Sequence, residues 1–332
     1  MKVKTWAAST VSKAQSCLRL LKYEKIDWYV SREIPSSNAQ GILTHAGLLE
    51  SYIASAMKGN AAGLMPPEAE IDAKARELEK KHQIKISQYD MSKALIYTET
   101  GYEYLKETGF LDGKDILFVE HKFEVSLRGY PFKGFIDVVL FDKARNVYQI
   151  LDLKTTSSEA AISGGKMWWE TKLMANQPVI YHEALKKVIG DPTIDIEIVY
   201  FVIRTTTGKP KLRPGVRKKK DESKEEYELR KADSIESHDE WFERLMGEYL
   251  GNKSKFALSS MVFLKSDIDN RMNEIIDVIA MTEHQTSFPR NPGNCSSFGG
   301  CAFVDVCLGT STLETDSNLI KLEKSKEEPL PF

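Results

Sequence analysis

Apolar residues recur at helical spacing through the first third of the chain. Four helices are predicted there, at residues 9–30, 37–58, 66–82 and 91–108. In the second of them, apolar residues return after three or four positions: Ile42, Leu43, Ala46, Leu49, Ile53 and Met57. Cys17 falls within the first turns of the first helix. The pattern therefore predicts a helical N-terminal lobe over residues 1–112.

The pattern then changes from helical to alternating. Four strands are predicted, at residues 116–127, 132–141, 147–154 and 196–204. A helical stretch at 165–189, interrupted by Pro178, separates the third strand from the fourth. Three strands, a helix and a further strand indicate an α/β fold, with helices packed on a mixed sheet. We expect residues 113–210 to form this core.

The rest of the chain is polar and mostly helical in pattern. A basic loop at 205–222 leads to charged helices at 223–251 and 261–282, within a helical C-terminal region over 211–310. Residues 311–332 are polar and end in Glu-Glu-Pro-Leu-Pro-Phe. This composition predicts a disordered tail.

Composition narrows the class of protein. The 332 residues are 42% hydrophobic and 28% charged, and they contain no apolar run long enough to span a membrane. The first fifteen residues lack the apolar stretch of a secretory signal, so we expect a cytoplasmic protein. A net charge of −2 argues against a generally basic, nucleic-acid-coating surface. The basic segment 209–220, which includes Arg217 and Lys218, is either a solvated loop or a local phosphate contact.

Two carboxylates and a lysine suggest a cation site. Asp152 and Lys154 share one face of the third strand, and Asp137 lies in the preceding strand, which a hairpin can bring alongside. Two adjacent carboxylates suit a hard cation such as Mg²⁺, and the Leu153 carbonyl is a further candidate ligand. Lys154 can stabilise charge on a phosphate. Asp-x-Lys is also a common tripeptide, so the spacing alone does not establish a catalytic role.

Several short motifs carry a family resemblance. They are Gly134-x-x-Asp137, Asp152-x-Lys154, Gln177-x-x-x-Tyr181, the His45 of Gly41-Ile-Leu-Thr-His45, and Glu120. Their order and spacing resemble the PD-(D/E)XK nuclease superfamily in its RecB-like branch, over about residues 12–308. The resemblance implies that His45, Asp137 and Asp152 bind Mg²⁺ or Mn²⁺. It also implies that Lys154 is the catalytic lysine, Glu120 an acidic member of the site, and Gln177 and Tyr181 contacts to DNA or to the lysine.

The four cysteines suggest a second metal centre. Cys17 stands alone, and Cys295, Cys301 and Cys307 follow as C-x5-C-x5-C. Four thiolates can hold one soft metal centre, either zinc or an iron–sulfur cluster, although four unrelated buried thiols are the simpler alternative. The arrangement resembles AddB-type and CRISPR-associated RecB-like exonucleases, which implies a [4Fe–4S] cluster that joins the two ends of the chain.

Other features bear on partners. Trp168 and Trp169, near Lys166, either stack on single-stranded DNA or pack in the core. The acidic tail that ends in Phe332 resembles those by which single-strand-binding proteins recruit partners; a plain disordered end is the alternative. A homo-oligomeric ring would favour processive digestion, but no residue indicates one.

The resemblance implies a metal-dependent DNA exonuclease in recombination, repair or phage DNA processing. The chain lacks a G-x-x-x-x-G-K-[ST] motif, which favours a phage or CRISPR-associated type over a helicase–nuclease fusion. The alternatives are a structure-specific endonuclease and a non-catalytic DNA-binding or assembly factor with the same fold.

Overall fold

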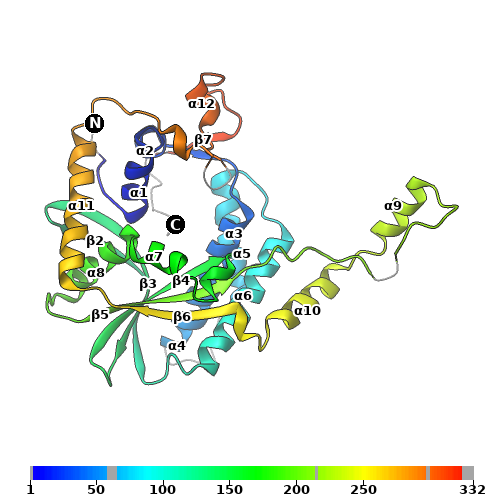
Figure 1. The fold of residues 1–332 in the computed structure, drawn as a ribbon, viewed down its shortest axis with the longest axis horizontal. Coiled ribbons are helices and arrows are strands. Elements are labelled where there is room, and N and C mark those ends of the chain that lie inside the picture. The colour runs from blue at the N-terminus through cyan, green and yellow to red at the C-terminus, as the bar shows by residue number, and fades with distance from the viewer. Residues whose placement is uncertain (1–2, 58–65, 214–215, 297–299, 324–332) are drawn as a thin grey trace.

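A five-stranded mixed sheet forms the centre of the molecule (Figure 1). The computed structural model describes residues 3–57, 66–213, 216–296 and 300–323. The sheet has the order β2–β3–β4–β5–β6, with the bounds Lys114–Leu127, Tyr130–Asp142, Val147–Thr156, Ile196–Arg204 and Phe256–Met261. Only β4 and β5 run parallel; the other neighbours are antiparallel. The predicted α/β fold with a mixed sheet is confirmed.

Helices cover both faces of this sheet. One face packs against α1 (Ala8–Ser16), α8 (Asn176–Ile189) and α11 (Lys265–Glu283). The other packs against α6 (Gln88–Glu107), α10 (His238–Tyr249) and a π-helix at Ala46–Ile53. None of the helices described in the structure is both long and apolar enough to cross a bilayer.

The alternation of β4 divides its side chains as the sequence predicts. Leu151 and Leu153 are buried in the core on the side of α6 and α10. Asp152 and Lys154 therefore occupy the opposite face, where α8 lies. The strand delivers two polar side chains to one side and keeps its apolar side chains in the core.

The N-terminal lobe is helical, as predicted. After α3 (Ser36–His45) the chain continues through the π-helix into α4 (Ala54–Met57), and α5 (Pro67–His82) leads to α6. The turn widens to π geometry directly after His45, and such segments are frequent at functional sites. The helical spacing of the sequence did not reveal this change.

The two ends of the chain are tied together. The predicted helix 9–30 is two helices, α1 and α2 (Leu18–Lys25), and Cys17 between them has extended backbone. β1 (Tyr29–Ser31) pairs with β7 (Leu319–Lys321), beyond the short helix α12 (Val304–Leu308). The expectation of a disordered tail is therefore wrong as far as Glu323, because backbone pairing to β1 orders this segment. Residues 324–332, with the proposed partner motif, lie outside the described residues.

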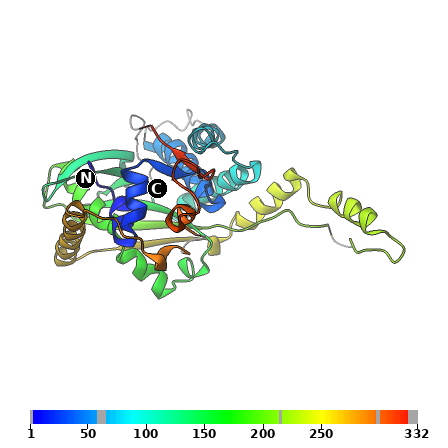
Figure 2. The ribbon, with the colours of Figure 1, turned by 90° about the horizontal axis from the view of Figure 1, so that it is seen from above.

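The C-terminal half contains a projecting arm and a strand that the sequence pattern missed. The predicted helix 223–251 is interrupted: α9 (Lys224–Ala232) stands off from the body and α10 returns to it, as Figures 1 and 2 show. β6 lies between the two predicted charged helices, at the edge of the sheet. The stretch at 165–189 divides into α7 (Lys166–Leu173) and α8.

Candidate active site and metal centre

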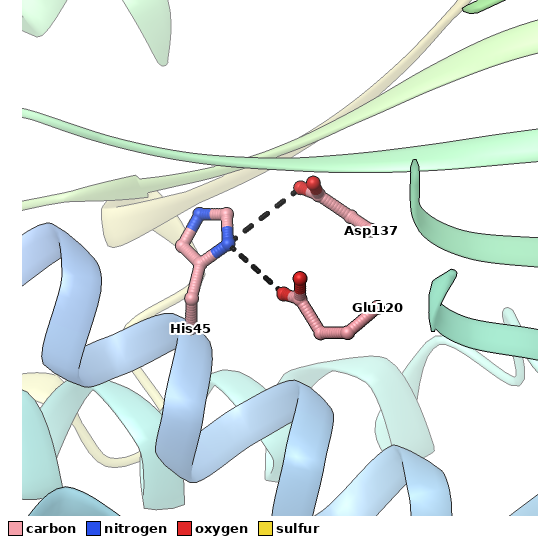
Figure 3. Close-up of side chains that lie close together, drawn as sticks. All are labelled: His45, Glu120 and Asp137. Carbon is pink, nitrogen blue, oxygen red and sulfur yellow. Dashed lines mark ion pairs between the residues drawn. The ribbon is translucent and has the colours of Figure 1, made fainter. Parts of the chain in front are cut away.

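Three separate segments bring His45, Glu120 and Asp137 together (Figure 3). His45 ends α3, Glu120 lies in β2 and Asp137 lies in β3. The Nδ1 atom of His45 is 3.7 Å from Glu120 Oε1 and 3.7 Å from Asp137 Oδ2. One candidate ligand atom from each side chain lies within 4.8 Å of the other two. Such spacing suits joint coordination of one cation.

The position of His45 depends on close packing of α3 against the end of β4. A Cβ atom at Gly41, one turn before His45, would lie 2.9 Å from Thr155 Oγ1, so glycine permits this approach. In the same contact, His45 Nε2 is 3.0 Å from the backbone oxygen of Leu153. An imidazole that donates its Nε2 hydrogen to this carbonyl directs the Nδ1 lone pair toward the two carboxylates, as a metal ligand requires. Cation binding by the Leu153 carbonyl itself stays a prediction.

Glu120 reaches the group through an unusual backbone conformation. Its φ angle is +46°, in the left-handed region, although it lies within a β-strand. The neighbours on either side pair in register with β3, so the interruption is local. Left-handed non-glycine residues cost on the order of 1–3 kcal/mol and cluster at functional sites. The strain is independent support for placing Glu120 in the site.

Asp137 joins this group to the next strand. Its Oδ2 atom accepts a hydrogen bond of 2.9 Å from the backbone nitrogen of Leu153. Burial raises the pKa of Asp137, against the opposing effect of His45. For His45, burial alone would lower the pKa, but the carboxylates of Asp137 and Glu120 outweigh it and raise the pKa. The group thus places two carboxylates close together in a buried position. A bound cation would offset both their mutual repulsion and the free-energy cost of burying their charges.

Asp152, Lys154, Gln177 and Tyr181 form a connected network beside this group. Lys154 Nζ lies 2.9 Å from Asp152 Oδ2 and donates to Gln177 Oε1 at 3.1 Å. Gln177 Nε2 donates to the Tyr181 hydroxyl at 2.9 Å. Burial raises the pKa of Asp152 to about 6, although Lys154 opposes the shift. Burial also disfavours a charge on Lys154, but Asp152 and Asp137 outweigh it and raise the pKa of the lysine.

The start of α8 aims Gln177 at the lysine. α8 begins at Asn176, so Pro178 lies in its first turn, where a missing backbone N–H is tolerated. This is the start that Pro178 requires if Gln177 is to face the site. Gln177 and Tyr181, four positions apart, share one helix face and are hydrogen-bonded.

Two features of the site differ from what the sequence indicated. Asp152, an expected ligand, is engaged by Lys154 and lies outside the three-residue group found among the described residues. Tyr200 was not singled out, yet it stands opposite Asp152 in the β4–β5 register and is buried. Burial, with the Asp152 charge next, raises the pKa of Tyr200. A tyrosine in an apolar strand gives no functional signal by itself.

Comparison with known proteins settles the family. A family model described as the PD-(D/E)XK nuclease superfamily matches residues 5–308. The chain belongs to this superfamily. Among solved structures, it is similar to a "Putative exonuclease" from Eubacterium rectale, at 10% sequence identity and a TM-score of 0.45, with 94% of this chain and 90% of that chain covered. No curated protein matches the chain.

The donor set of this nuclease fits a divalent cation. PD-(D/E)XK nucleases use divalent metals, and the group of His45, Glu120 and Asp137 offers two carboxylates and one imidazole. Carboxylate oxygens suit Mg²⁺ and Mn²⁺, and one imidazole is compatible with Mn²⁺ in particular. Glu120, which the resemblance implied only as an acidic member of the site, would be the third donor.

The aromatic pair of α7 is partly packed into the nuclease core. The ring centres of Trp168 and Trp169 lie 4.6 Å apart in an edge-to-face arrangement. Both side chains contact the apolar cluster on the face of the sheet that α1, α8 and α11 cover. Lys172 Nζ lies 4.7 Å from the Trp168 ring centre. Burial lowers the pKa of Lys172, and the Lys154 charge adds to the shift, which places α7 beside the site. Lys166 is exposed at the start of the same helix.

The cysteines lie at the junction of the two ends of the chain. Cys17, Cys295 and Cys301 line a cavity of about 300 Å³. Burial raises the pKa of Cys301, and the other three thiols, including Cys307, contribute to the same shift. The four cysteines therefore gather in one region, as the resemblance implied. The break between α1 and α2 at Cys17 corrects the expectation that this residue lies inside a helix.

Side-chain amides fix this junction next to Cys17. Asn291 and Asn294 donate to the backbone oxygen of Ser16, at 2.9 Å and 2.7 Å. Arg19 Nε donates to the Phe288 oxygen at 3.0 Å. The cysteine triplet is thus held against the N-terminal helices by direct hydrogen bonds.

Proposed function

We propose that this nuclease hydrolyses DNA from its ends in a reaction that depends on Mg²⁺ or Mn²⁺. The observation that carries the proposal is the meeting of His45, Glu120 and Asp137 with a charged, hydrogen-bonded Lys154 on the adjacent strand. A cation-binding group and a positioned ammonium are the two elements that phosphodiester hydrolysis needs. The biological setting that we propose is recombination, repair or phage DNA processing in the cytoplasm.

Each side chain has a distinct role in this proposal. Imidazole and carboxylates would hold the cation, which when bound polarises the scissile phosphate and acidifies a water molecule. Asp152 attracts positive charge into the site and fixes one side of the Lys154 ammonium. Gln177 fixes the other side, and Tyr181 holds Gln177. Lys154 can then donate hydrogen bonds to the negative charge that develops on the phosphate.

Substrate contacts next to the site are proposed for α7. Trp168 and Trp169 offer ring faces near Lys172, and Lys166 is exposed at the helix start. Bases stack on aromatic rings irrespective of sequence, and lysines attract the backbone. Because both rings also contact the core, we expect their outer edges alone to meet a DNA strand.

The cysteines are proposed to hold a [4Fe–4S] cluster that stabilises the fold. Thiolates on one tetrahedral zinc ion stand about 3.8 Å apart, as bonds of about 2.3 Å dictate. Among the described residues, no three cysteine sulfurs come within 4.8 Å of one another. The adjoining cavity of about 300 Å³ offers room for a centre larger than a single zinc ion. The cluster would join Cys17 to the C-terminal triplet and close nearly the whole chain into a loop.

The mode of cleavage is tested with linear and closed-circular DNA of the same sequence. An exonuclease degrades the linear form from one end and leaves circular single strands intact. Cleavage of the circle would identify an endonuclease, and binding without cleavage of either form would identify a non-catalytic factor. Polarity follows from which end-label is released first.

A further inference from the structure

The projecting arm, described over residues 209–213 and 216–237, is firmly attached at its base. It leaves the sheet where β5 ends: the Thr205 backbone nitrogen donates to the Thr156 oxygen, next to the catalytic end of β4. The indole nitrogen of the buried Trp241 donates a hydrogen bond to the backbone oxygen of Gly208 at 2.6 Å. Lys93 Nζ donates to the backbone oxygen of Thr207 at 2.9 Å. The base of the arm is therefore fixed relative to the active site.

The two limbs of the arm are paired with each other. Leu212 and Ile235 form an antiparallel bridge, and Arg213 donates from its backbone nitrogen to Ser234 at 2.8 Å. The Arg213 Nη2 atom donates to both carboxylate oxygens of Glu240 at the start of α10, at 2.8 Å and 2.9 Å. This pairing gives the arm a defined direction, away from the body in both views (Figure 2).

Beyond the bridge, the arm carries a run of exposed positive charge. Arg217, Lys218, Lys219 and Lys220 are consecutive and exposed, and three residues separate them from α9. Two carboxylates of the arm pair with residues outside the basic run, Glu222 with Arg230 and Glu228 with Lys231. Within the described ranges, none of the four side chains of the basic run enters an ion pair. The segment 209–220 contains seven basic residues and no acidic one.

The α9 helix that follows contributes nothing to the core. None of its residues is buried, and Leu229 is 69% exposed. A capping box at Ser223 and the Arg230 contact to Glu222 maintain the helix locally. The helix is stabilised by its own contacts and does not pack against the core. The charged side chains of this segment therefore face the solvent, where a binding partner can contact them. DNA phosphates, already the substrate of the proposed function, complement that charge.

The length of the arm sets the distance at which it would act. Twelve residues separate Thr205, beside the end of β4, from Arg217, and an extended chain spans at most about 40 Å over that length. Duplex DNA rises about 3.4 Å per base pair, so 40 Å corresponds to about 12 base pairs. The basic run would therefore contact backbone up to one helical turn from the scissile phosphate.

We propose that the arm binds the phosphate backbone of duplex DNA about one helical turn away from the active site. This inference rests on the proposed nuclease function and adds a second, remote contact to it. The basic run binds phosphates without reading sequence, because lysine and arginine contacts to the backbone carry no base information. The arm favours substrates long enough to span both sites.

The test compares a fourfold substitution with a matched control. In the arm variant, Arg217, Lys218, Lys219 and Lys220 are each changed to Ala. The control removes four exposed lysines from the body of the protein: Lys143, Lys187, Lys253 and Lys265, each changed to Ala. Both variants lose four positive charges, so a difference between them reports position and not net charge. Thermal unfolding of both checks that the fold is intact.

Binding is measured with Ca²⁺ in place of Mg²⁺, so that cleavage is suppressed, on a 30-base-pair duplex and on a hairpin with a stem of about six base pairs. We expect the arm variant to bind the duplex at least about tenfold more weakly than the wild-type protein. The slope of the logarithm of the binding constant against the logarithm of the salt concentration should become shallower by up to about 3.6. Binding to the hairpin and cleavage of it in Mg²⁺ should match the wild-type protein.

Equal duplex binding by the arm variant and the control would overturn the proposal, as would an equal loss on duplex and hairpin. Loss of cleavage is scored separately on the hairpin, which is too short to reach the arm. If the wild-type protein cleaves neither substrate, but the arm variant still loses binding to the duplex and not to the hairpin, the nuclease function is refuted and the arm contact stands.

Discussion

The buried Asp152 makes a specific prediction about folding stability. Burial raises its pKa to about 6, against an ordinary value of 3.8. Because the folded-state value is the higher one, protonation stabilises the fold fully below pH about 4, and this stabilisation is lost as the pH rises through about 6. A shift of roughly two units corresponds to about 3 kcal/mol. Asp152→Asn removes this pH dependence, because an amide does not titrate.

The assay is urea unfolding of metal-free protein between pH 4 and 7.5, followed by circular dichroism. The unfolding free energy of Asp152→Asn relative to wild type should rise by about 2–3 kcal/mol across this range, with most of the change between pH 4 and 6. Asp277→Asn, at an exposed position on α11, is the control for removal of a carboxylate. A flat difference for Asp152→Asn would mean that burial does not raise the pKa of this carboxylate, and a falling difference would mean that the fold lowers it; either result would refute the reasoning.

Substitutions at Glu120 and at Cys301 test the two proposed metal sites. Glu120→Gly should weaken Mn²⁺ binding at least tenfold. It should change the unfolding free energy by less than about 1 kcal/mol, because glycine adopts a φ of +46° without strain. Glu120→Ala keeps the strained backbone and should be the less stable of the two variants; the reverse order of stability in urea unfolding would contradict this. Cys301→Ser should lower the iron content and visible absorbance of the purified protein and make the C-terminal segment sensitive to protease, whereas unchanged iron and protease resistance would exclude the cluster.

Much of the fold follows from local pattern. The long strands β2 to β5 alternate or are apolar throughout, and α5 and α6 repeat apolar residues at helical spacing. Local preference and tertiary packing agree in these elements. The motifs predict a common site for Asp137, Asp152 and Lys154, and the structure brings these three residues together.

The features that the sequence did not reveal depend on distant contacts. The helix break at Cys17 accompanies hydrogen bonds to Ser16 from Asn291 and Asn294, about 275 positions away. β1 and β7 are three residues long and gain strand geometry from each other. β6 is a six-residue edge strand between helices, too short for a clear period.

The membership of the candidate metal-binding group of His45, Glu120 and Asp137 could not be predicted from sequence spacing alone. The left-handed backbone of Glu120 aims its carboxylate at His45, and a local interruption of this kind leaves no trace in an alternating pattern. The contact of His45 with Leu153 likewise depends on how closely α3 approaches β4. Three-dimensional packing, and not residue type, decides that Glu120 joins His45 and Asp137 while Asp152 pairs with Lys154.

The central claim is that Lys154 and the adjoining carboxylates hydrolyse DNA with a divalent cation. The most direct test is digestion of end-labelled linear DNA in Mg²⁺ or Mn²⁺ by wild type, Lys154→Ala and, as a control, Lys187→Ala at an exposed position of α8. We predict that wild type and Lys187→Ala release label, that Lys154→Ala is slower by at least about a hundredfold with its fold intact, and that chelation of the cation stops all cleavage. Cleavage by Lys154→Ala at the wild-type rate would contradict the account.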